Sequence, residues 1–61
     1  MRTFQLFTTD ERNAAPTLAF VTVRNIDRVL ELARSTLNAS RHHLAVEVHQ
    51  GDEMIARFSR D

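Results

Sequence analysis

The spacing of apolar residues changes twice along this chain, and that change constrains its fold more than any other feature. Near the N-terminus and again after Ser40, polar and apolar residues alternate with a period near two, and residues 17–24 are rich in β-branched and aromatic residues, both typical of strands. Between these parts, Ile26, Val29, Leu30, Ala33 and Leu37 follow the i, i+3, i+4, i+7, i+11 spacing of an amphipathic helix. The pattern therefore predicts β-structure on both sides of one helix.

Four segments are typical of strands: about 2–9, 17–24, 43–49 and 54–60. The helix is expected over about 26–39, with Asn25 as its N-cap and Asp27 in its first turn, where a carboxylate favours the helix dipole. Two hairpins joined by one helix predict a two-layer α+β domain of order ββαββ, with the helix on one face of a four-stranded, mainly antiparallel sheet. Two strand orders stay open: 1-2-4-3, fully antiparallel, and 1-2-3-4, with one parallel pair.

The turn at Gly51-Asp52 decides the register of the second hairpin. A two-residue loop there would place Val46 opposite Arg57 and mix core with charge. An odd-length loop would place Val46 beside Phe58, or one step along the same face. Because register follows the buried face, the sequence favours the odd-length loop.

The chain length makes a partner a plausible source of stability. Sixty-one residues form one domain, residues 1–61, and a core of this size supplies only roughly 3–5 kcal/mol. Small domains are often reinforced by disulfides, a metal or oligomerisation. The chain has no cysteine, which excludes a disulfide framework and a thiolate metal site. Self-association is the reinforcement that remains.

All three histidines lie in RHHLAVEVHQGDE, residues 41–53, which raises the question of a metal site. Strict alternation places His43, Glu47 and His49 on one face. At about 3.3 Å for each residue along a strand, His43 and His49 lie on the order of 20 Å apart, too far for one zinc ion. Glu47 and His49 could share an ion, but a third ligand would have to come from the next turn or another subunit. We therefore expect no bound metal and no cofactor.

No residue pattern in the chain indicates catalysis. Gly51 is the single glycine, so there is no glycine-rich phosphate-binding loop, and no serine lies in a nucleophile elbow. One helix over one small sheet rarely encloses a pocket that shifts a pKa. We therefore expect no catalytic residues, and a protein that is not an enzyme.

Apolar residues fall on both faces of the expected sheet, although one helix covers only one of them. In the second strand, Leu18 and Phe20 alternate with apolar rather than polar neighbours, whereas an antiparallel sheet with a wet face should alternate cleanly. Each such side chain contributes about 1.5–3 kcal/mol when buried. A homodimer, through stacked sheets or paired edge strands, would bury them. The residues expected on the uncovered face are Phe7, Ala19, Val21 and Val23.

Two structural alternatives would remove the need for a partner. A β-bulge in the first strand would turn Phe4 and Phe7 to the same side of the sheet. The loop at residues 10–16 would serve equally if it folded over the uncovered face.

The charged residues favour neither nucleic acid nor a membrane surface as partner. Eight basic residues balance eight acidic ones, and the two signs are interspersed. All eight basic residues are arginine, which suits bidentate phosphate contacts, although codon usage explains the same bias. Nucleic-acid binding through sheet-borne Arg24, Arg57 and Arg60 is the alternative function. It lacks the Tyr and Trp residues of typical stacking platforms.

Residues 1–10 contain no continuous apolar run of the kind that secretion or membrane insertion needs, so a cytoplasmic protein is expected. The layout resembles that of many short bacterial proteins of strand-strand-helix-strand-strand form, a likeness of pattern that carries no site, ligand or reaction. The sequence thus predicts a small, non-catalytic homodimer that acts as a protein-interaction or regulatory module with an unidentified protein partner.

Overall fold

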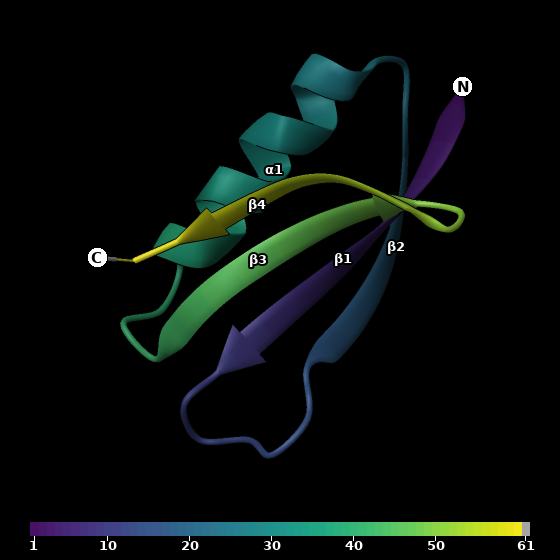
Figure 1. The fold of residues 1–61 in the computed structure, drawn as a ribbon. Helices are drawn as coiled ribbons and strands as arrows, with labels where there is room; N and C mark the ends of the chain where they lie inside the picture. The colour runs from purple at the N-terminus through teal and green to yellow at the C-terminus, as the bar shows by residue number, and fades with distance from the viewer. Residues whose placement is uncertain (61) are drawn as a thin grey trace.

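The computed structural model describes residues 1–60 and has the order ββαββ (Figure 1). The elements are β1 (Arg2–Asp10), β2 (Thr17–Val23), α1 (Ile26–Asn38), β3 (His43–Gln50) and β4 (Glu53–Ser59). The four strands form one antiparallel sheet, and α1 packs on one face of it. The two-layer α+β fold class predicted from the apolar periodicity is confirmed.

The strand order is β2-β1-β3-β4, so both expected orders are wrong. β1 is an inner strand that pairs antiparallel with its hairpin partner β2 and also with β3. The α1 connection therefore starts at an edge strand and passes across β1 to reach β3. The inner position buries Phe4 and Leu6 of β1 between two neighbouring strands, which an edge position would not do.

The helix begins and packs as its sequence predicts. The Asn25 side chain accepts a hydrogen bond from the Arg28 backbone N–H at 3.0 Å, which satisfies one of the free amides of the first turn. Val29, Ala33 and Leu37 are the buried residues of α1, and they belong to the predicted apolar stripe. The helix packs mainly against β3 and leaves β2 at the far edge of the sheet (Figure 1).

The second hairpin turns through two residues, Gly51 and Asp52, because Gln50 pairs directly with Glu53. The prediction of an odd-length loop is therefore wrong. Gly51 has a φ of 60°, in the left-handed region that two-residue hairpin turns require and that glycine adopts without steric cost.

The register of that hairpin nevertheless follows the buried face. Val46 pairs with Phe58, as the burial argument predicts. The register shifts between Val48 and His49, where Ile55 of β4 is an extra residue that forms a β-bulge. Because of the bulge, the hairpin turns through two residues and still keeps Val46 beside Phe58 in the apolar core.

A second irregularity changes the direction of His43. Thr9 pairs with Ala45 but Asp10 pairs with His43, so Leu44 is an extra residue in β3. The expected alternation, with His43 on the same face as Glu47, is therefore wrong. His43 instead faces α1.

Candidate functional site

An exposed apolar patch lies on the face of the sheet that α1 does not cover, here called the open face. The β1–β2 register places Phe7 beside Leu18, and Gln5 beside Phe20. In β1, Gln5 and Phe7 alternate with core residues, so they lie on the open face. Their partners in β2 share that face. The Phe20 side chain is 67% exposed and that of Leu18 is 46% exposed. Leu18 and Phe20, together with the partly buried Phe7, are called the apolar patch below.

The other half of the open face, on β3 and β4, is charged. Glu47 pairs with both Phe7 and Arg57 across the sheet. Its carboxylate lies 2.9 Å from His49 Nε2 and 3.5 Å from Arg57 Nε. The His49 ring packs edge-on against Phe7, with 4.9 Å between ring centroids. The open face is thus divided into an apolar half and a charged half.

The residues predicted to face outward are Phe7, Ala19, Val21 and Val23, and for three of them the predicted face is wrong. Ala19 pairs with Leu6, and Val21 pairs with Phe4. Directly opposite residues share a face, so these two, with Val23, lie on the α1 side, where Val23 is buried in the core. Only Phe7 is on the open face, where the other two members of the apolar patch accompany it.

Neither structural alternative to a partner is present in residues 1–60. The β1–β2 register runs without a shift from the Arg2–Val23 pair to the Thr8–Thr17 pair, so no bulge brings Phe4 and Phe7 to one side. The loop residues 11–16 are themselves exposed, and the Phe20 side chain stays open to solvent.

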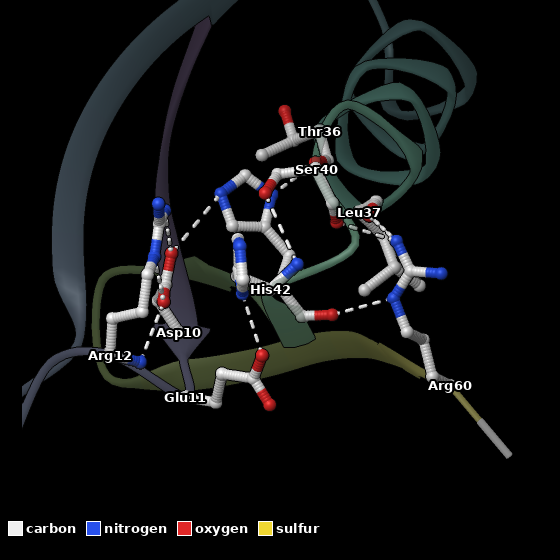
Figure 2. Close-up of polar contacts among 9 residues, drawn as sticks. Asp10, Glu11, Arg12, Thr36, Leu37, Ser40, His42 and Arg60 are labelled. Atoms are coloured by element: carbon white, nitrogen blue, oxygen red, sulfur yellow. Dashed lines mark hydrogen bonds and ion pairs between the residues drawn. The ribbon is translucent and has the colours of Figure 1, made fainter.

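A polar cluster lies where β1 ends and β3 begins (Figure 2). Its centre is Asp10, whose side chain is 5% exposed. The Asp10 carboxylate accepts hydrogen bonds from Arg12 Nε at 3.0 Å, Arg12 Nη2 at 2.7 Å and the Arg12 backbone N–H at 2.8 Å. His43 Nε2 lies 3.8 Å from the same carboxylate. The buried charge is therefore fully partnered, as burial of a carboxylate requires.

These contacts hold the pKa of Asp10 well below its ordinary value. The largest cause is the side-chain hydrogen bond from Arg12, followed by the bond from the Arg12 backbone N–H, and burial opposes both without outweighing them. In turn, the bond to Asp10 raises the pKa of Arg12.

We expect the protein to lose stability in acid through Asp10. Because its folded-state pKa lies below the unfolded value of about 3.9, the contribution of Asp10 is fully present above about pH 4 and is lost as the pH falls toward the folded-state pKa. Asp10→Asn should lower the unfolding midpoint at pH 7 and make its decrease between about pH 5 and pH 2 shallower. Urea unfolding at several pH values measures both effects.

The control is Asp52→Asn, which removes a carboxylate from an exposed position in the turn between β3 and β4. This variant should keep the acid dependence of the wild-type protein. An Asp10→Asn protein whose stability falls in acid as steeply as that of the wild type would contradict the prediction.

The three histidines make separate contacts. His42 Nδ1 lies 2.6 Å from Glu11 Oε2, and His43 Nδ1–H donates to the Thr36 carbonyl at the end of α1, also at 2.6 Å. His49 contacts Glu47, the pair that the sequence singles out as able to share an ion. Within residues 1–60, no group of three or more His, Asp or Glu side chains is placed to hold a metal ion.

The three arginines of the nucleic-acid alternative do not form one basic surface. Arg60 is engaged at the end of α1, where its guanidinium donates to backbone carbonyls (Figure 2). Arg57 lies beside Glu47, and Arg24 follows β2 at the opposite end of the sheet from Arg60.

Sequence reasoning missed the Asp10 cluster because His43 comes from a segment far from Asp10 and Arg12 in the chain. A local signal was nevertheless present: an aspartate at the end of a strand commonly accepts a hydrogen bond from the amide two residues later. Asp10 and Arg12 have that spacing, and the bond forms.

No helix within residues 1–60 has the length and apolar character needed to cross a membrane. The chain matches no protein-family model, and its comparison with curated proteins and with solved structures gives no significant match.

Proposed function

We propose that the protein is a small, non-catalytic cytoplasmic module that forms a homodimer through the apolar half of its sheet and acts by binding another protein. The observation that carries this proposal is the exposure of Phe20, a large apolar residue that is 67% exposed on a face that no element within residues 1–60 covers. Leu18 and Phe7 extend the same surface.

Full burial of a Phe or Leu side chain contributes about 1.5–3 kcal/mol, and a domain of this size is held by roughly 3–5 kcal/mol. Covering even part of the apolar patch in each of two copies therefore yields free energy that is a substantial share of the stability of the fold. The charged half of the face, with Glu47, His49 and Arg57, has no such gain from burial.

Phe20→Ser is expected to weaken the dimer at least about tenfold, since a tenfold change in Kd corresponds to 1.4 kcal/mol and each copy loses one buried aromatic side chain. Sedimentation velocity over a concentration series measures the change. Met54→Ser is the matched control, because Met54 is also an exposed apolar residue, at 52%, but pairs with His49 in the charged half. The control should dimerise as the wild type does.

Circular dichroism establishes that both variants keep the fold. A wild-type chain that remains monomeric at every accessible concentration would overturn the proposal.

A further inference from the structure

We infer that the dimer forms by antiparallel pairing of β2 with β2 of a second copy, which joins the two four-stranded sheets into one continuous sheet. This inference rests on the proposed self-association and specifies its geometry. It follows from a comparison of the two sheet edges, β2 and β4.

The β2 edge has none of the features that keep edge strands from pairing. Isolated edges are usually protected by charges, prolines or bulges. β2, with the sequence TLAFVTV, contains no charged residue, proline or glycine. Its register with β1 has no shift over its whole length. The strand is therefore a regular, uncharged row of free backbone groups.

The β4 edge is protected in the way that β2 is not. The bulge at Ile55 interrupts the regular spacing of its backbone groups. Glu53 and Arg57 place charges of both signs along it. Of the two edges, β2 is the one suited to pair with another strand.

The approach to β2 is also open. Residues 17–20 are all exposed, although they alternate between the two faces of the sheet. The helix packs mainly against β3, on the far side of β1, so it does not overhang the β2 edge (Figure 1). The exposed residues 17–20 therefore leave this part of the β2 edge accessible to a second copy.

Two-fold symmetry and strand geometry select the register. In antiparallel pairing, directly opposite residues share a face, and a two-fold axis perpendicular to the sheet makes one residue face its own copy. Phe20 is the middle residue of the seven in β2, so an axis through it pairs the whole strand. Phe20 then lies opposite Phe20 of the second copy, and Leu18 lies opposite Thr22.

This register joins the two apolar patches. The two Phe20 Cβ atoms would lie about 5 Å apart on the open face, with a Leu18 side chain of one copy on each side of the pair. The result is a single apolar band at the centre of the dimer, flanked by the charged halves contributed by β3 and β4 of each copy. The same pairing thus gives hydrogen-bond partners to the free backbone groups of the β2 edge and covers part of each Phe20 side chain.

Cysteine cross-linking tests the pairing directly, because the chain has no cysteine of its own. Leu18→Cys and Thr22→Cys are made as separate single variants of the full chain. Both positions are exposed, so neither substitution disturbs the core. Under mild oxidation we expect a covalent dimer only when the two variants are mixed, since residue 18 of one copy lies opposite residue 22 of the other.

Each variant alone should stay unlinked. In this register the two copies of residue 18 are four strand positions apart, on the order of 13 Å, beyond the roughly 7 Å Cα separation that a disulfide spans. Met54→Cys, on the charged half of the open face, is the control and should remain unlinked alone and in both mixtures.

The outcomes separate this inference from the proposed function. A dimer in sedimentation that gives no cross-link in the mixture would overturn the β2 pairing and leave self-association in place. Self-linking of Leu18→Cys or of Met54→Cys would replace edge pairing with a stacked arrangement or another edge. A monomeric wild-type chain would overturn both proposals.

Discussion

Phe4→Ala is expected to abolish cooperative folding of this protein. Phe4 is completely buried, and it packs in the core between the sheet and α1. Replacing a buried Phe with Ala costs about 3–5 kcal/mol, through lost apolar burial and the cavity that remains. A domain of this size is held by roughly the same free energy. The variant should therefore show no unfolding transition, or one close to the lowest accessible temperatures.

Phe20→Ala is the matched control, because it makes the same chemical change at a side chain that is 67% exposed. Its effect on folding within one chain should be small, and its main effect should fall on dimerisation. Thermal unfolding followed by circular dichroism, at a concentration where both variants are monomeric, compares the two. A Phe4→Ala protein with the unfolding midpoint of the wild type would show that the core is not where the structure places it.

Arg60→Ala is expected to destabilise the protein by about 2 kcal/mol, the scale of hydrogen bonds from a charged donor. The Arg60 guanidinium donates to the carbonyls of Leu37 at 2.7 Å, Ser40 at 2.6 Å and His43 at 2.6 Å. These carbonyls belong to the end of α1, the following loop and the start of β3. One side chain from the end of β4 thus joins three segments.

The charge of Arg60 acts in the same direction as its hydrogen bonds. The last turn of α1 contains no basic residue of its own. Arg60 supplies the positive charge that the negative end of a helix dipole favours. Arg60→Lys should be intermediate, because lysine keeps the charge but lacks the planar set of donors that contacts several carbonyls at once.

Urea unfolding of both Arg60 variants measures the loss, with Arg24→Ala as the control at an exposed arginine at the opposite end of the sheet. In thermal unfolding, a loss of about 1 kcal/mol in the free energy of unfolding lowers the Tm of a domain of this size by roughly 4–8 °C. Equal stability of Arg60→Ala and Arg24→Ala would mean that the contacts of Arg60 contribute nothing to the fold.

The two β-bulges show where sequence reasoning failed. A bulge inserts one residue, which reverses the face of every residue on one side of it. At Leu44 this reversal turned His43 toward α1 and brought it near Asp10, so the polar cluster could not be found from alternation. At Ile55 the extra residue restores the apolar register after a two-residue turn, whereas strict alternation predicted an odd-length loop.

The predicted face of β2 failed for a different reason. The sequence showed that Leu18 and Phe20 alternate with Ala19, Val21 and Val23, but not which set faces the helix. That depends on pairing with β1, where Val21 lies beside the fully buried Phe4. The presence of apolar residues on both faces was visible in the sequence, whereas the identity of the exposed set was not.

The sequence by itself determined the elements of this protein, their order and the buried face of the helix, because helix and strand periodicity, capping and turn chemistry are local properties. It also limited the second hairpin to registers that keep one face apolar, with Val46 beside Phe58 or one step along, and the structure has the first of these. The tertiary structure alone decided the strand order, the two bulges, the Asp10 cluster and the three carbonyls bound by Arg60. These features depend on how the strands and the helix pack together, and several arrangements satisfy the same local pattern until the whole core is packed.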